Sequence, residues 1–326
     1  MTYAERVSAV AALGFTERQA SFLVLVMLHS GVCVGRQYCA FAGIVRGQKM
    51  ADFFKKLAAK RYATPYPCGH NKARVYHVHN AKLYDAIGQR DVRFRKRSAL
   101  ARTIERVMML DHIIAHRDIT WLGAEQDKVA HFLTTTSLRR EELPRLTFGR
   151  GADITVRYFP DKLPIGVSLD GRSHVLLYLL SEPIGDDFRI FLRRHAELLR
   201  ALPAWSIRLL VPTGIDSEVV DAYEAAFREE LATPLHPTVA NELRWFYQSA
   251  DITGAVDRTR LRRARRAFGA PRFRAIRKAW LQDGDRVVDV AMSSSLADAI
   301  ARESGRFERH ELSRQYFHLS SMVGSA

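Results

Sequence analysis

The chain has 326 residues, of which 47% are hydrophobic, and its 50 Lys and Arg against 35 Asp and Glu give a net charge of +15. No apolar run approaches the ~20 residues needed to span a bilayer, and the first residues lack a signal-peptide pattern, so we expect a cytoplasmic protein and no membrane partner. The large positive charge favours an anionic polymer as partner, which makes nucleic acid the simplest interpretation. Three cysteines indicate no disulfide framework, and the length predicts two or three domains.

Residues 16–79 show the order of elements of a winged helix-turn-helix. Thr16 is a good N-cap, and Gln19 stands where it completes a capping box. The apolar run that follows predicts a buried scaffold helix over Glu17–His29. The other expected elements are a short helix, a second helix and the two strands of a hairpin, at residues 35–41, 48–61, 62–67 and 73–79.

The second of these helices has the two faces of a recognition helix. Its apolar residues recur at helical spacing, so we expect them to pack on the scaffold, while its polar and mostly basic residues face solvent. Gln48 and Asp52 are the candidates for base edges, and the lysines for phosphates. The predicted DNA-contacting residues of the helix are Gln48, Lys49, Asp52, Lys55, Lys56 and Lys60. Lys72 and Arg74 near the hairpin tip would contact the backbone or the minor groove. The alternative is a winged helix used only for protein contacts.

A basic tract over residues 90–106 begins the next part of the chain. The stripe of apolar residues that follows predicts a connecting helix over residues 98–116. Its basic start either touches the DNA backbone or is a solvated face, and both interpretations stay open. A strand end near residues 120–123, a helix at 124–133 and the start of another at 134–137 are the expected elements after it.

Beyond Gly149–Gly151 the periodicity becomes that of a small α/β domain with a mixed sheet. The nearly continuous apolar run Ser173–Leu180 is typical of a central buried strand. The expected strands are at residues 154–159, 163–169, 173–180 and 206–212, and the expected helices are at residues 186–202 and 217–231.

The last ninety residues contain a second basic region. Between Arg258 and Lys278 there are ten basic residues and no acidic one, and Gly269-Ala270-Pro271 divides the tract into two amphipathic helices. Such a pair could offer a second phosphate-binding surface, or a basic face packed on an acidic partner. The predicted contacts are Arg262, Arg263, Arg265, Arg266, Arg274, Arg277 and Lys278. A strand at residues 286–292 and a helix at residues 295–303 are expected to follow.

Catalytic signals are weak. Pro160-Asp161 at a strand end resembles the first element of PD-(D/E)xK nucleases, but the next strand offers Glu182 only at its end and no lysine. No phosphate-binding loop of the Gly-rich Lys-Ser/Thr type is present. The spacing of Cys68, His70, His77 and His79 matches no common structural zinc site. We therefore expect no catalytic residue, no metal and no cofactor.

Taken together, these features resemble the replication-relaxation family of bacterial plasmids and conjugative elements. The resemblance is carried by Phe15–Gln19, the basic helix Gln48–Arg61, the connector Met108–His116 and Pro160-Asp161, and it covers residues 15–212. It implies a nuclease-derived second domain and DNA control on a mobile element. The chain departs from the family in lacking an acid inside Val175–Leu180 and in its added basic C-terminal region, which leaves DNA binding as the expectation.

The sequence thus predicts an α+β protein of four segments. Residues 1–95 form a winged helix-turn-helix and residues 96–150 a helical connector. Residues 151–235 form a nuclease-like α/β domain without activity, and residues 236–326 a basic helical region. The expected function is that of a non-enzymatic, nucleoid-associated regulator of transcription or replication that binds double-stranded DNA, as a homodimer because many winged-helix proteins bind two half-sites. The alternatives are a metal-dependent nuclease centred on Asp161 and Glu182, and an adaptor with protein partners in a nucleoprotein assembly.

Overall fold

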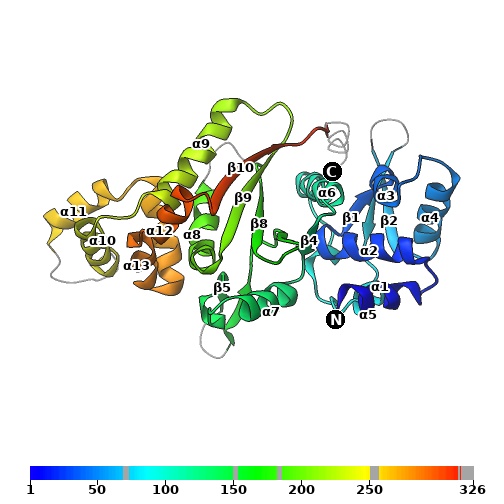
Figure 1. Ribbon diagram of the computed structural model, residues 1–326, viewed down its shortest axis with the longest axis horizontal. Coiled ribbons are helices and arrows are strands. Elements are labelled where there is room, and N and C mark those ends of the chain that lie inside the picture. Colours follow the sequence, from blue (N-terminus) through cyan, green and yellow to red (C-terminus); the bar gives the residue numbers. More distant parts are fainter. Residues whose placement is uncertain (69–72, 150–152, 182–185, 250–256, 315, 317–326) are drawn as a thin grey trace. The chain divides into compact units, whose positions relative to one another are not determined.

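The computed structural model describes residues 1–68, 73–149, 153–181, 186–249, 257–314 and 316 (Figure 1). The chain is a mixed α+β protein. It divides into two compact units: unit 1 comprises residues 1–124 and 311–326, and unit 2 comprises residues 125–310. The four segments expected from the sequence are therefore grouped differently, since most of the connector belongs to unit 1 and the basic region shares unit 2 with the α/β part. No helix of the described residues is long and apolar enough to cross a membrane.

Unit 1 contains the elements expected for residues 16–79, with nearly the expected bounds. Thr16 caps α2 and forms a capping box with Gln19, as predicted. Two helices that the sequence analysis does not anticipate, α1 and α5, pack in the same unit. The helices of unit 1 are α1 (Tyr3–Ala11), α2 (Glu17–His29), α3 (Gly35–Ala42), α4 (Gln48–Ala59), α5 (Ala81–Ala86) and α6 (Leu100–Ala115), and its strands are β1 (Val32–Val34), β2 (Ala63–Pro67), β3 (Arg74–Val78) and β4 (Ile119–Leu122).

A small antiparallel sheet of order β1-β3-β2 lies beside α2, α3 and α4 in unit 1 (Figure 1). The hairpin register pairs Ala63 with Val78 and Pro67 with Arg74. The apolar face of α2, with Phe22, Leu23 and Met27, is completely buried and forms the centre of the core. Burial of this face is what makes α2 a scaffold on which α4 and the hairpin rest.

Unit 2 is built on strands β7 to β10. The helices are α7 (Glu125–Thr135), α8 (Asp186–Ala201), α9 (Ser217–Phe227), α10 (Pro237–Ser249), α11 (Arg258–Ala267), α12 (Pro271–Asp283), α13 (Arg286–Met292) and α14 (Ser295–Ala301), and the strands are β5 (Arg145–Phe148), β6 (Thr155–Tyr158), β7 (Ile165–Ser168), β8 (Ser173–Leu179), β9 (Ala204–Val211) and β10 (Gly305–Glu311). The helix α7 precedes strands β7 to β10, α8 lies between β8 and β9, and α9 to α14 lie between β9 and β10.

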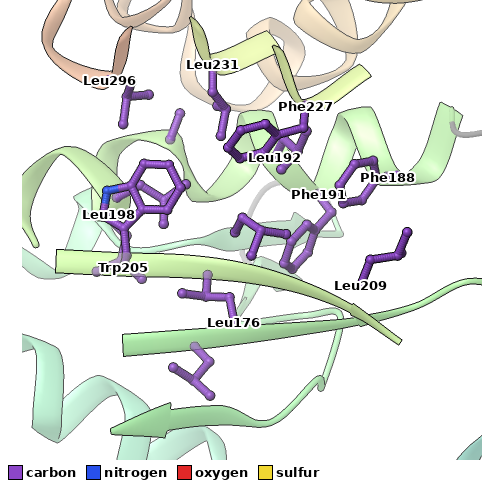
Figure 2. Close-up of a cluster of buried hydrophobic side chains, with 14 of the residues drawn as sticks. Leu176, Phe188, Phe191, Leu192, Leu198, Trp205, Leu209, Phe227, Leu231 and Leu296 are labelled. Carbon is purple, nitrogen blue, oxygen red and sulfur yellow. The ribbon is translucent and has the colours of Figure 1, made fainter. Parts of the chain in front are cut away.

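The main sheet of unit 2 is mixed, as predicted, and its strands lie in the order β10-β9-β8-β7. β8 is antiparallel to β7 and parallel to β9, so the run Ser173–Leu180 is indeed an interior strand. The helix α8 joins β8 to β9 and covers a face of the sheet. Figure 2 shows Phe191 of α8 on the side facing the sheet, near Leu209 of β9, and Leu192 beside Phe227, in a cluster of buried apolar side chains.

The basic C-terminal helices fold around a core of their own. Phe246 and Tyr247 of α10, Phe268 at the end of α11 and Ile276 of α12 are buried together with apolar residues of α13. The break at Gly269-Ala270-Pro271 lies where the sequence predicts it, with Pro271 as the first residue of α12, where its missing N–H costs nothing. This region is therefore a packed helical subdomain and not a tail.

Three expected elements differ in the structure. Residues 286–292 form the helix α13 and not a strand, because Val287, Val288 and Ala291 recur at helical spacing and pack against α10 and α12, which outweighs their β propensity. The strand β6 pairs with β5 in a separate two-stranded sheet, outside the mixed sheet. No helix begins at residues 134–137, where α7 ends.

Candidate nucleic-acid interface

The helix α4 presents two opposite faces, as its sequence predicts. Phe53, Phe54 and Leu57 are at most 3% exposed. The ring of Phe53 stacks on Tyr38 of α3 at 4.3 Å between centroids, and that of Phe54 stacks on Tyr76 of the hairpin at 4.1 Å. These contacts fix the helix between α3 and the β2–β3 hairpin, so the direction in which its outer face points is determined by the core.

The outer face of α4 is a polar stripe of exposed side chains. Gln48, Asp52 and Lys55 follow one another at spacings of four and three residues, which places them on one side of the helix. The amide nitrogen of Gln48 donates to the Asp52 carboxylate over 2.6 Å, so these two side chains orient each other. Lys49 and Lys55 are exposed, and no hydrogen bond or ion pair within the described residues holds either ammonium group.

Two of the lysines predicted to contact DNA, Lys56 of α4 and Lys60 just after it, point away from this polar stripe. Lys56 donates to the backbone oxygen of Gly14, and its ammonium lies 4.9 Å from the centre of the Phe15 ring. Lys60 donates to the oxygen of Leu13 over 3.3 Å. Both lysines thus lie along the edge of α4 that packs against the loop before α2. They contribute positive potential, but their ammonium groups are engaged within unit 1.

The amino end of α4 is open to solvent. Its N-cap is Gly47, which provides no side-chain cap, so the first backbone N–H groups of the helix lack a side-chain acceptor. Val45 is 89% exposed, and Arg46 beside it is exposed as well. The helix dipole and Arg46 both attract an anion to this end.

The hairpin lies beside α4 and carries basic residues. Arg74 is exposed at the start of β3. The guanidinium of Arg97, from the basic tract, lies 5.1 Å from the ring centre of Tyr66 on β2. Lys72, the other residue predicted for the tip, lies outside the described residues.

The basic tract of residues 90–106 has a mixed environment. Arg95 donates to the backbone oxygens of Arg90 and His79, and Arg106 lies over the ring of Phe94, so these two side chains support the fold. Arg93 and Lys96 are exposed to solvent. Part of the tract is therefore structural, and part of it adds to the positive surface of unit 1.

The second basic surface lies on α11 and α12. The predicted contacts Arg262, Arg263, Arg265, Arg266, Arg274 and Lys278 are exposed, and Arg277 is half-buried. Arg274 pairs with Asp186 over 3.0 Å. The side chains of Arg265, Arg266 and Lys278 have no hydrogen bond or ion pair within the part of the chain that the structure describes. Arg272, by contrast, is buried and donates to the oxygen of Thr233.

Asp161 lies among positive and neutral side chains of unit 2. Its Oδ1 pairs with Arg194 over 2.5 Å. The buried Lys128, whose Nζ donates to the Leu163 oxygen over 2.7 Å, has its pKa lowered to about 8 by burial, an effect that the charge of Asp161 partly offsets. Burial likewise lowers the pKa of His195 to about 4. Lys128 is not among the residues predicted for the site, because a lysine in a helix is ordinarily exposed and its burial depends on the packing of the helix.

The environment of Asp161 bears on the metal site that the nuclease alternative requires. Arg194 pairs with one carboxylate oxygen, while the other oxygen is buried and has no hydrogen-bond partner among the described residues. Within those residues, no group of three or more potential ligands includes Asp161. The other predicted acid, Glu182, lies outside the described residues.

The histidines of the hairpin, which the sequence analysis considered as zinc ligands, contact groups of the protein. His77 Nε2 is 2.9 Å from the oxygen of Phe94, and His79 Nε2 is 2.8 Å from the hydroxyl of Thr64. Cys68 is buried, which raises the pKa of its thiol, and His70 lies outside the described residues. These contacts give His77 and His79 structural roles in the hairpin.

No protein-family model, curated protein or solved structure matches the chain.

Proposed function

We propose that unit 1 is a winged helix-turn-helix that binds double-stranded DNA, with α4 as its recognition helix and the β2–β3 hairpin as its wing. The observation that carries this proposal is the division of α4 into a buried aromatic face and an exposed polar stripe beside an uncapped helix end. A helix of this kind can enter the major groove, while its scaffold stays packed behind it.

In this proposal Gln48 and Asp52 meet base edges. A Gln amide pairs with adenine, and an Asp carboxylate accepts from the amino group of cytosine. The hydrogen bond between the two side chains orients them before DNA arrives. Lys49, Lys55 and Arg46 then hold phosphates at the start and middle of the helix.

The biological role that we propose is regulation of transcription or replication on a mobile element. It rests on the resemblance to the replication-relaxation family and on the net charge of +15. We propose a homodimer, because two copies of unit 1 would read two half-sites, and a wider footprint through the exposed arginines of α11.

The decisive experiment is a selection of the purified full chain against a random duplex library, in EDTA and at physiological salt. An enriched inverted repeat with half-sites about one helical turn apart supports the proposal. Binding without enrichment contradicts sequence-specific regulation and favours the adaptor role. Adding Mg²⁺ to the same complexes tests the nuclease alternative, which requires cutting that Asp161→Ala abolishes.

The assignment of α4 has its own test. Lys55→Glu should weaken duplex binding about ten-fold at low salt and reduce the slope of log K against log salt by about 1, because one phosphate contact is lost. The control is Lys82→Glu, which makes the same charge change at an exposed position of α5 in unit 1. Equal effects of the two substitutions in fluorescence anisotropy would show that α4 is not the contact surface.

A further inference from the structure

A hollow in the basic helical subdomain has an aromatic floor and an arginine rim. Its volume is about 410 Å³. That volume lies within the range of small-molecule sites, ~300–1,000 Å³. It is lined by Phe246, Tyr247, Arg265, Phe268, Phe273, Arg274 and Arg277.

The aromatic residues have distinct positions in this hollow. Phe246, Tyr247 and Phe268 are buried and belong to the core of the subdomain, whereas Phe273 is half-buried. Within the described residues, the only ring that Phe273 contacts is that of Phe268, at 5.0 Å between centroids. The two rings meet edge to face, at 73° between their planes, so within that part of the chain no aromatic ring stacks on Phe273.

The arginines around the hollow also differ. Arg274 is held by Asp186 and by the oxygen of Gly269 at 2.9 Å. Arg265 is exposed on α11, and no hydrogen bond or ion pair within the described residues holds its guanidinium. An unpaired guanidinium beside a recessed aromatic ring matches a ligand that is planar and apolar at one end and anionic at the other.

We propose that this hollow binds one unpaired nucleotide of single-stranded DNA, with the base against Phe273 and its phosphate on Arg265. An aromatic ring can stack on any of the four bases, because every base has a planar face. The guanidinium of Arg265 can form two parallel hydrogen bonds to the phosphate. No acidic residue lies between Arg258 and Lys278 in the sequence, so this stretch would not repel a polyanion that continues beyond the hollow. This site stands apart from duplex binding by α4 and does not depend on it.

The test compares two short single-stranded probes of equal length on the full chain: oligodeoxythymidylate and a deoxyribose-phosphate strand without bases. Fluorescence anisotropy should show that Phe273→Ala weakens binding of the oligodeoxythymidylate about ten-fold, while binding of the abasic strand is unchanged. Phe273→Leu keeps the apolar bulk and should behave like Phe273→Ala. Arg265→Ala should weaken binding of both probes.

The matched control is Arg266→Ala, which removes an exposed charge next to Arg265 outside the hollow. The proposal is overturned if both Phe273 variants bind the two probes as the unmodified chain does, or if Arg265→Ala and Arg266→Ala have the same effect. Lys55→Glu should leave binding of both single strands intact, which separates a failure of this site from a failure of the recognition helix.

Discussion

At the scale of single residues, the most deeply buried charge cluster is centred on Glu230. The Glu230 carboxylate is completely buried and pairs with Arg193, whose side chain is 2% exposed, and with Arg189 over 2.8 Å. It lies in the π-helical turn Arg228–Ala232 that continues α9. The cluster joins this turn to α8, so it stabilises the layer of helices that covers the main sheet.

Glu230→Gln should lower the free energy of unfolding of unit 2 by about 3 kcal/mol, because it leaves the buried charge of Arg193 without a counter-ion. Urea denaturation followed by tryptophan fluorescence measures this change, since Trp205, Trp245 and Trp280 lie in unit 2. The control is Glu229→Gln, whose carboxylate also meets Arg189 but is 41% exposed, and which should cost less than about 1 kcal/mol. Equal losses of unfolding free energy in the two variants would contradict a special role for the buried pair of Glu230 and Arg193.

At the scale of elements, the connection between α2 and β1 depends on Gly31. Its φ of +72° lies in the left-handed region, and a Cβ there would lie 2.6 Å from the backbone oxygen of Phe94. The oxygen of Gly31 accepts from the N–H of Val78 over 2.8 Å, so the same residue anchors the end of β3. A side chain would therefore disturb the helix, the sheet and the chain at Phe94 together.

Gly31→Ala should lower the free energy of unfolding of unit 1 by more than about 2 kcal/mol, through backbone strain and the contact with Phe94. Gly43→Ala is the matched control, because its φ of +65° is similar but nothing lies within 4 Å of the added Cβ. The control should cost only about 1 kcal/mol. Hydrogen exchange of the amides of α2 reports the difference, and equal protection in the two variants would rule out the contact with Phe94.

At the scale of the whole molecule, the chain leaves unit 1 after residue 124 and returns to it at residue 311. Near its end, the Tyr316 hydroxyl donates to Asp111 of α6 over 2.6 Å. Arg36 of α3 donates to both oxygens of the same carboxylate, over 2.5 and 2.7 Å. Asp111 thus ties the last described residue of the chain to two helices of unit 1, and unit 2 is an insertion in the sequence of unit 1.

Asp111→Asn should release this end of the chain, because the neutral amide loses its charge-assisted bonds to Arg36 and cannot accept at both oxygens. Trypsin should then cut after Arg314 several times faster in the intact protein. Asp118→Asn, at an exposed aspartate shortly after α6, should leave the rate unchanged. If cleavage is equally fast in the two variants and the unmodified chain, Asp111 does not hold the chain end.

Local signals made much of the fold predictable. The capping box at Thr16, the helical spacing along α4 and the proline break before α12 act within a few residues, so α2, α4, α11 and α12 follow from the sequence alone. The interior position of β8 follows from its continuous apolar run, since both faces of such a strand must be buried.

The amino-acid sequence by itself determined the α+β class, most element bounds and the polar stripe of α4, because periodicity and capping depend on near neighbours. Only the tertiary structure decided that residues 286–292 are a helix, that Lys56 and Lys60 turn to the loop before α2, and that Lys128 is buried. It also brought Phe273 and Arg265 to one hollow with Phe246 and Tyr247 of α10, a helix that the sequence analysis did not identify. Such contacts join residues far apart in the chain, and their geometry is set by the packing of whole helices.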